Sequence, residues 1–263
     1  MTANMPNVPD RFNLAGQIII VTGAGRGLGR TFAIGLANVG AHVVVAGRSA
    51  NDLQDVVAQI AVSGGTAMAH QFDASDADQC ANLVAATVER FGALNGIVVN
   101  HGITVHATAY DVTPEDFRKV VDVNLSGAFL CSQAAGRQMR DQRRGGSVVL
   151  ISSNASFLAY DELIAYGASK GGLDQICRQL GAEWAPDAIR VNAIGPGYMD
   201  SHMRGTEGGY EDDENKRRIL SAIPMQRRGE PDELLGAAMF FLSEASTYVT
   251  GQYLAIDGGY SLV

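Results

Sequence analysis

The sequence has few cysteines and no excess of basic residues. Its 263 residues include three cysteines, Cys80, Cys131 and Cys177, which lie far apart in the chain. An odd number without close spacing argues against a disulfide framework and a cysteine-based zinc site. Lysine and arginine number 20 against 28 aspartate and glutamate residues, which gives a formal net charge of −8. A phosphate backbone would be repelled, so nucleic acid is not an expected partner.

Long apolar runs and a secretory leader are also missing. No apolar stretch approaches the roughly 18 residues that span a bilayer. Residues 1–10 lack a basic segment followed by an apolar one, so we expect a cytoplasmic protein without a membrane partner. Hydrophobic residues make up 46% of the chain and charged residues 18%, which provides for a sizeable core and is too little charge for a disordered chain.

Short apolar runs alternate with helical stretches along the chain. The clear runs lie at 18–21, 43–45, 97–99, 148–151, 189–194 and 253–256, with a weaker one at 67–72. Long helices are expected at 116–140 and 166–184. Continuous apolar strands that alternate with helices predict an α/β fold. We expect a single Rossmann-type domain over residues 1–263, in which a doubly wound, parallel, seven-stranded sheet carries helices on both faces and the catalytic site.

One stretch interrupts this rhythm. Residues 205–216 contain a Gly-Gly pair and an acidic run at 211–214. Two interpretations stay open, namely a mobile substrate loop or short helices over the site, spanning about 198–220, and a solvated surface loop.

A glycine-rich loop follows the first strand and opens a helix. It reads Thr-Gly-Ala-Gly-Arg-Gly-Leu-Gly at 22–29. Glycine lets the backbone approach a pyrophosphate closely, and the helix amino terminus adds free N–H groups and a positive dipole end. This strand–loop–helix context predicts a dinucleotide site. The expected contacts are Gly23, Gly25, Arg26, Gly27 and Leu28.

The end of the second strand bears on the choice of cofactor. An acidic residue there would bind the 2′-hydroxyl of NAD(H), whereas a nearby arginine accommodates the 2′-phosphate of NADP(H). The chain has Gly47 followed by Arg48, with Arg26 in the glycine loop. The missing acid and the two arginines favour NADP(H), with NAD(H) still possible.

A tyrosine and a lysine stand four residues apart at the start of a predicted helix. This spacing places Tyr166 and Lys170 on one face, one turn apart. A nearby ammonium lowers the pKa of a phenol from its usual value of about 10, which suits an acid/base catalyst. Ser153 stands 13 positions earlier at the end of a strand, where open α/β sheets bind ligands. Ser152 is the competing serine.

These motifs resemble those of the short-chain dehydrogenase/reductase family, in order and at the same intervals from about residue 12 to the carboxyl terminus. The Thr-Gly-x-x-x-Gly-x-Gly loop, the Ser-to-Tyr interval and the Tyr-x-x-x-Lys pair carry the resemblance. It implies that Ser153 positions the substrate oxygen, that Tyr166 is the acid/base, and that Lys170 holds the nicotinamide ribose and lowers the tyrosine pKa. It also implies that the main chain of Asn124 holds a proton-relay water.

The resemblance further implies a set of cofactor contacts beyond the glycine loop, and a homotetramer. In addition to Tyr166 and Lys170, these contacts are Asp73 and Ala74 at the adenine, Asn100 and Gly102 after the fourth strand, and Pro196, Gly197, Met199 and Ser201 at the nicotinamide. From the residues alone, Asp73 could equally be a helix cap, since Ser75 and Asp76 share its turn.

One motif departs from the family. Val99-Asn100-His101-Gly102 stands where the family usually has Asn-Asn-Ala-Gly. His101 therefore puts a titratable ring beside the cofactor, where it could touch substrate or tune the site near neutral pH. A hydrogen-bonded spacer without a catalytic part is the favoured interpretation.

The expected activity is the interconversion of a secondary alcohol and a ketone. Residues 12–17 and the end of the second strand look like sugar-acid, gluconate 5-dehydrogenase-type members, and a polar lining with Asn154, His101, Tyr198 and His202 suits a small polar substrate such as a sugar acid or polyol. The alternative is a 3-oxoacyl-thioester reductase acting on acyl carrier protein. Its acidic partner calls for a basic patch, which Arg143-Arg144 supply only in part, while Asp187 stands where such reductases often add an arginine.

A non-enzymatic cofactor-binding scaffold is a third, less favoured alternative. It predicts loss of Tyr166 or Lys170, and both are present. No metal is expected, because no histidine pair or Cys/His cluster occurs.

Overall fold

One parallel sheet organises the molecule. In the computed structural model, which describes residues 7–201 and 213–263, seven strands pair in the order β3-β2-β1-β4-β5-β6-β7. All six pairings are parallel. The strands are β1 Ile18–Thr22, β2 His42–Gly47, β3 Thr66–Gln71, β4 Gly96–Val99, β5 Gly146–Ile151, β6 Ile189–Pro196 and β7 Tyr253–Ile256. The predicted doubly wound sheet is confirmed, including the weak third strand.

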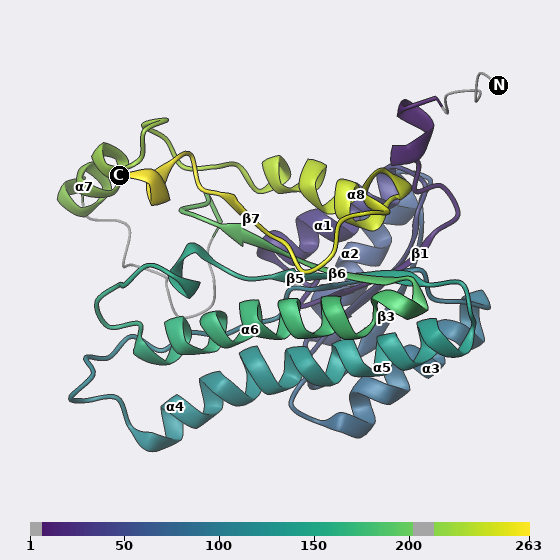
Figure 1. Ribbon diagram of the computed structural model, residues 1–263, viewed down its shortest axis with the longest axis horizontal. Helices are drawn as coiled ribbons and strands as arrows, with labels where there is room; N and C mark the ends of the chain where they lie inside the picture. The colour runs from purple at the N-terminus through teal and green to yellow at the C-terminus, as the bar shows by residue number, and fades with distance from the viewer. Residues whose placement is uncertain (1–6, 202–212) are drawn as a thin grey trace.

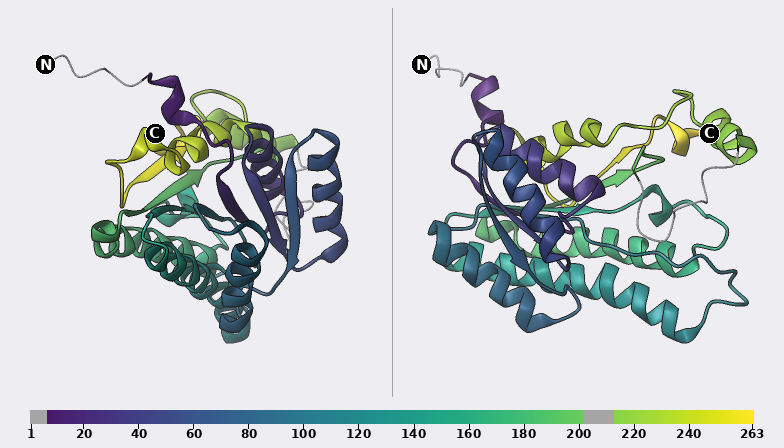
Figure 2. Two further views of the ribbon diagram at one scale, coloured as in Figure 1. Left: turned by 90° about the vertical axis from the view of Figure 1, so that its right-hand side faces the viewer. Right: turned by 180° about the vertical axis from the view of Figure 1, so that it is seen from behind.

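Helices cover both faces of this sheet (Figures 1 and 2). They are α1 Gly27–Asn38, α2 Ala50–Val62, α3 Ala77–Phe91, α4 Pro114–Val121, α5 Gly127–Asp141, α6 Ile164–Glu183, α7 Asp213–Ala222 and α8 Leu235–Leu242. Short 3-10 turns occupy Pro9–Phe12, Asn154–Ser156, Ala185–Asp187, Pro231–Leu234, Glu244–Ser246 and Tyr260–Leu262. Within these described ranges no helix is long and apolar enough to cross a bilayer.

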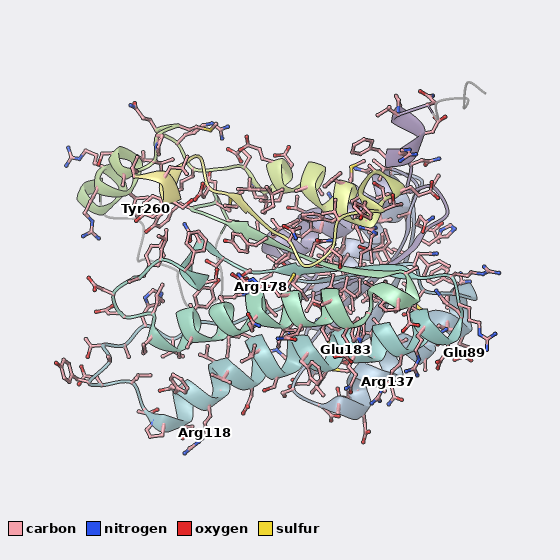
Figure 3. The ribbon with its side chains drawn as sticks, in the orientation of Figure 1. Glu89, Arg118, Arg137, Arg178, Glu183 and Tyr260 are labelled. Atoms are coloured by element: carbon pink, nitrogen blue, oxygen red, sulfur yellow. The ribbon has the colours of Figure 1, made fainter. Side chains whose placement is uncertain are left out.

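The core divides into two clusters because successive strand residues point to opposite faces. In β4, Ile97 and Val99 join α3, α5 and α6 in one cluster, whereas Val98 joins α1, α2 and α8 in the other. Charged side chains such as Arg118, Arg137 and Glu183 lie on the outer surfaces of the helices (Figure 3). Burial on both faces explains why the strands read as continuous apolar runs.

The predicted helix at 116–140 has an irregular turn in its middle. α4 and α5 are consecutive helices, and Asp122–Ser126 between them forms a π-helical turn. The amide of Gly127 accordingly donates to the carbonyl of Asp122, five residues back. This turn carries Asn124, and such single π turns are frequent at functional sites. The other long helix, α6, matches its prediction to within two residues.

The strand order reverses between β1 and β4. In the sheet, β2 and β3 lie on one side of β1, and β4 to β7 lie on the other. At such a switch point the connections after the two strands diverge, so a crevice opens at their carboxyl ends. The glycine loop after β1 and residues 100–102 after β4 therefore meet there.

Truncating a central core residue tests this architecture. Leu150 on β5 has no exposed surface, so Leu150→Ala is expected to lower the free energy of unfolding by roughly 2–5 kcal/mol through lost burial and a cavity. The control is Val62, which is 90% exposed at the end of α2. Val62→Ala should change the free energy of unfolding by no more than about 0.5 kcal/mol. Denaturant titration followed by circular dichroism measures both, and equal effects would contradict the assigned core.

Candidate active site

A cavity of about 620 Å³ opens at the carboxyl ends of the strands. Its described wall contains every predicted catalytic and cofactor-binding residue except Asn124. The lining runs from the glycine loop, past the ends of β2 and β3, to residues 100–106, 151–155 and 196–201. The position agrees with the rule that open α/β sheets bind ligands at their carboxyl edge.

The glycine loop is shaped for close backbone approach. Gly23 has a φ of +65°, and a Cβ there would come within 2.8 Å of the Cα of His101, so a side chain is excluded on both grounds. Nδ2 of Asn100 donates to the carbonyl of Thr22 at 3.1 Å and so ties the end of β4 to the loop. Arg26 precedes α1 in an extended conformation, and no described side chain caps this helix. Its first N–H groups are thus available to an anion.

The side of the cavity at the ends of β2 and β3 carries two exposed arginines and a carboxylate. Arg26 and Arg48 are exposed, and Asp73 is partly buried. Oδ1 of Asp73 accepts bonds from the amide and the hydroxyl of Ser75, at 2.9 and 2.7 Å, and the side-chain bond is the largest cause that lowers the pKa of this carboxyl. The cap of α3 is Asp76, which accepts from the amides at 78 and 79. Asp73 closes a local turn and does not cap the helix.

Tyr166 and Lys170 come together as the helical spacing predicts. Both lie near the start of α6, with Nζ of Lys170 5.6 Å from the centroid of the Tyr166 ring. Lys170 is 3% exposed, and its ammonium donates to the carbonyl of Ile151 at 2.7 Å. Burial lowers the pKa of Lys170 to about 8, while the carboxylate of Asp174 acts in the opposite direction. This cation is therefore held at the tyrosine by both the helix and the end of β5.

The two candidate serines differ in what their hydroxyls contact. Ser152 is buried and donates to Oδ1 of Asp174 at 2.6 Å. Ser153 is only partly buried, and its oxygen accepts a longer bond from the amide of Ala155, at 3.2 Å. Since Ser152 is committed to a carboxylate, the geometry favours Ser153 as the serine that can face a substrate.

Asn124 lies behind the cavity wall. Its Oδ1 accepts from the amide of Ile103 at 2.8 Å, and its Nδ2 donates to the carbonyl of Ile103 at 2.9 Å and to Ser169 at 3.1 Å. Ser169 in turn donates to the carbonyl of Tyr166. The side chain of Asn124 thus links the π turn, residue 103 and the start of α6.

The hydrogen bonds around Thr22 determine the tautomer of His101. The Thr22 oxygen accepts from the amides of Asn100 and His101, at 3.0 and 3.3 Å. Its single proton therefore goes to Nδ1 of His101 at 2.8 Å, which is closer than the carbonyl of Val98 at 3.4 Å. Nδ1 is then an acceptor and Nε2 carries the proton. Burial, with the nearby charge of Lys170, lowers the pKa of His101 to about 4, and a main-chain interaction with Val123 opposes this.

The segment after β6 is fixed by pairing with a distant loop. Gly197 donates to the carbonyl of Ile256 at 3.0 Å. Met199 forms an isolated β-bridge with Gly229. The amide of Gly229 donates to the carbonyl of Tyr198 at 3.0 Å, and the amide of Asp200 donates to the carbonyl of Gly229 at 2.7 Å. Pro196, Gly197, Met199 and Ser201 all line the cavity. His202 and residues 202–212 of the predicted substrate loop lie outside the described residues, whereas residues 213–220 of that loop belong to α7.

Comparison with known proteins decides the family. Residues 23–261 match the family model described as "Enoyl-(Acyl carrier protein) reductase". L-Rhamnose 1-dehydrogenase of Azotobacter vinelandii is 38% identical over 94% of this chain and 97% of its own. A 3-oxoacyl-[acyl-carrier-protein] reductase of Synechocystis is 34% identical over 94% and 97%. The crystal structure of a gluconate 5-dehydrogenase from Burkholderia cenocepacia, in complex with NADP and tartrate, has a TM-score of 0.92 and 32% identity and covers 98% of this chain and 100% of that one.

This chain belongs to the short-chain dehydrogenase/reductase family. The resemblance stated from the motifs is confirmed, and with it the class of enzyme, an NAD(P)-dependent oxidoreductase of alcohol and carbonyl groups. The roles of the individual residues remain predictions.

Two residues of this short-chain dehydrogenase/reductase were missed by sequence reasoning. Asp174 stands one helical turn after Lys170, and this spacing could have indicated a carboxylate near the ammonium. Arg228 also lines the cavity, and it has no comparable signal because its loop is remote in sequence from every motif.

The stability of the fold should report the state of His101. The folded pKa lies below the usual 6.5 of histidine, so between pH 6.5 and about 4 the unfolded chain binds a proton that the folded chain does not. Stability is therefore lost as the pH falls through this window, by up to roughly 3 kcal/mol. His101→Gln should remove this part of the pH dependence in denaturant titrations. The exposed His106→Gln variant is the control, and identical slopes for His101→Gln and wild type would contradict a buried neutral imidazole.

Proposed function

We propose that this enzyme interconverts a secondary alcohol and a ketone on a small, polar substrate such as a sugar acid or polyol, with NADP(H) as the preferred cofactor. The observation that supports a polar substrate is a pair of polar side-chain atoms in the cavity wall. Oγ1 of Thr104 and Nδ2 of Asn154 are buried and have no hydrogen-bond partner in the described structure. Buried polar groups are normally paired, so a ligand with several hydroxyls suits this wall better than a hydrocarbon chain.

The cavity fits a dinucleotide. A side chain at Gly23 would collide with the main chain of His101, and the uncapped amino terminus of α1 faces the cavity through Gly27 and Leu28. These features support a pyrophosphate on the glycine loop. Arg26 and Arg48 would hold a 2′-phosphate and Asp73 and Ala74 the adenine. Asn100, Gly102, Pro196, Gly197, Met199 and Ser201 would surround the nicotinamide half.

The residues near Tyr166 suit proton transfer to a carbonyl oxygen. When bound, NADPH supplies the hydride that the carbonyl carbon receives. Tyr166 donates the proton to the oxygen in reduction and takes it back in oxidation, while the Ser153 hydroxyl holds that oxygen. The Lys170 ammonium favours the phenolate form of Tyr166 and would hold the nicotinamide ribose. The main chain of Asn124 holds the water that returns the proton.

A 3-oxoacyl-thioester reductase is the alternative. The Synechocystis relative carries that name, and the same Tyr166 chemistry would serve it. A net charge of −8 and the polar cavity wall weigh against an acidic carrier protein and its acyl chain. The hypothesis of a non-enzymatic cofactor-binding scaffold has less support still, because the Lys170 ammonium lies next to the Tyr166 ring, as acid/base catalysis requires. A homotetramer in the cytoplasm stays a prediction of the family resemblance.

Turnover of a substrate panel tests the function. We expect the protein to oxidise NADPH with keto-sugar acids and ketoses, and to show little activity with acetoacetyl thioesters. Tyr166→Phe removes the transferable proton and should lower kcat by roughly 10²–10⁴-fold. Tyr248→Phe, at a fully exposed tyrosine, is the matched control. Preference for the thioester would establish the alternative, and full activity of Tyr166→Phe would refute the proton role.

Cofactor preference can be tested at the end of β2. A side chain at Gly47 would meet Leu53 at an ordinary 3.5 Å, so Gly47→Asp should be tolerated. The new carboxylate repels the 2′-phosphate and can bind a ribose hydroxyl. The ratio of kcat/KM for NADPH over NADH should therefore fall by about tenfold or more. Ser63→Asp adds the same charge at the exposed end of α2 and should leave the ratio unchanged. An unchanged ratio in Gly47→Asp would contradict the proposed 2′-phosphate site.

A further inference from the structure

Arg228 reaches the cavity from a loop that no sequence motif marks. It directly precedes Gly229, whose main chain pairs with the segment after β6 through Tyr198 and Asp200. Tyr198 and Met199, which line the cavity, are thus the neighbours of Arg228 across this pairing. The position places a cation at the nicotinamide and substrate end of the cavity, away from the two arginines of the adenine side.

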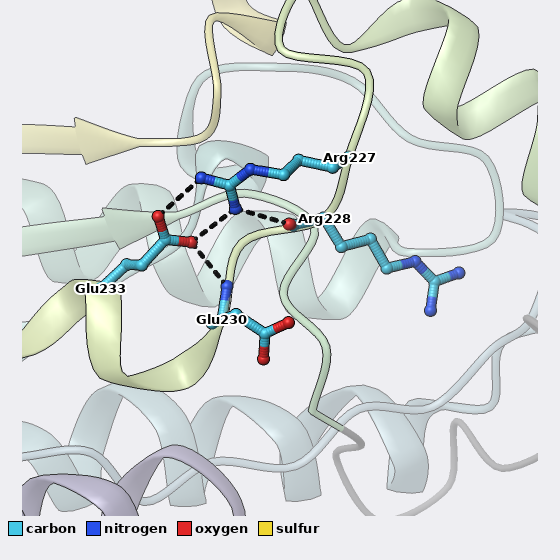
Figure 4. A network of polar contacts seen from close by, with 4 residues as sticks. All are labelled: Arg227, Arg228, Glu230 and Glu233. Atoms are coloured by element: carbon cyan, nitrogen blue, oxygen red, sulfur yellow. Dashed lines mark hydrogen bonds and ion pairs between the residues drawn. The ribbon is translucent and has the colours of Figure 1, made fainter.

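The loop holds the two adjacent arginines in opposite directions. Arg227 forms a two-pronged ion pair with Glu233, with both N–O distances at 2.7 Å, and donates to the carbonyl of Arg228 at 3.0 Å. Glu233 also accepts from the amide of Glu230 at 2.7 Å. The side chain of Arg228 extends away from this network (Figure 4), and its Nε and Nη2 atoms are shielded from solvent. The side chain of Arg227, by contrast, is 54% exposed.

The charges along the described cavity wall are unevenly distributed. Its carboxylates are Asp52, which packs against Gly25, and Asp73, which follows β3. Both belong to the cofactor end. The described residues of the other end include Asn154, Tyr160 and Tyr198, which are uncharged, and no acidic residue. A guanidinium in such a wall favours an anionic ligand group, and its planar fork matches a carboxylate through two parallel N–H bonds.

We infer that Arg228 binds the carboxylate of the substrate, so that the enzyme acts on hydroxy- and keto-carboxylic acids of the sugar-acid type in preference to neutral sugars. This inference rests on the proposed function, because it assigns the substrate class of the same site. The shared chemistry is recognition of an oxyanion, which the pyrophosphate of the cofactor could also supply. The test must therefore separate a carboxylate on the substrate from a phosphate on the cofactor.

Kinetics with a matched pair of substrates makes this separation. NADPH oxidation is measured with 5-ketogluconate and with its methyl ester, which lacks the charge. In Arg228→Met, the acid-to-ester ratio of kcat/KM is expected to fall by roughly 10- to 100-fold, the range for a charge-assisted hydrogen bond. Arg228→Lys keeps the charge without the fork and should retain part of the ratio. Arg137→Met, on the exposed face of α5 (Figure 3), should match the wild type.

Cofactor affinity is measured on the same variants by NADPH fluorescence. A dissociation constant for NADPH that stays within about twofold of wild type in Arg228→Met, together with the lost acid preference, supports the inference. A weaker NADPH complex with equal losses on acid and ester would assign the anion to the cofactor and overturn it. Equal losses with unchanged NADPH binding would also overturn it.

Binding without turnover distinguishes this inference from the proposed function. If the wild type reduces neither substrate, calorimetry of the NADP⁺-loaded protein with gluconate and with neutral glucitol is decisive. Gluconate binding that depends on Arg228 supports the carboxylate site even though the proposed activity fails. Equal affinity for gluconate and glucitol, or gluconate binding that survives Arg228→Met, overturns the inference.

Discussion

The central strands are buried along their whole length, so a polar side chain on them needs a hydrogen-bond partner inside the protein. Every residue of β1 and β4 is buried, and helices cover both faces of the sheet. Polar atoms in such a layer lose water and need protein partners, as Asn192 on β6 finds in Val249 and Gln252. Functional side chains therefore collect at the carboxyl edge. The reversal of strand order between β1 and β4 makes one part of that edge a cavity.

Two titratable groups share that cavity, and the charge of one shifts the pKa of the other. The Lys170 ammonium donates to the carbonyl of Ile151, and the charge of Asp174 opposes the lowering of its pKa by burial. His101 is kept neutral by burial and by the charge of that lysine. The Thr22 hydroxyl fixes which ring nitrogen carries the proton. The histidine that replaces the usual alanine is thereby a neutral, hydrogen-bonded link between β1 and the residues after β4, and its lack of a catalytic part stays a prediction.

Periodicity and motif spacing predicted the sheet, the long helices and the residues that gather in the cavity. Each of these follows from patterns that are local in sequence, such as apolar runs or a four-residue interval on a helix. The features that escaped prediction depend on local hydrogen bonds or on distant pairing. The interval to Tyr166 favoured Ser153 over Ser152, but the contact of Ser152 with Asp174, which occupies the competing serine, was not predicted. Arg228 enters the site because Gly229 pairs with the strand after Tyr198, a contact that no spacing indicates.

The π turn at Asp122–Ser126 has a geometric consequence for the helices on either side. A π turn accommodates one residue more than an α turn, and each residue advances an α-helix by about 100°. The faces of α4 and α5 are therefore out of phase although the helices follow one another. α4 packs against α6, whereas α5 packs against α3. The extra residue thus lets two consecutive helices pack against different neighbours. It also turns Asn124 toward residue 103, at the turn between the two helices.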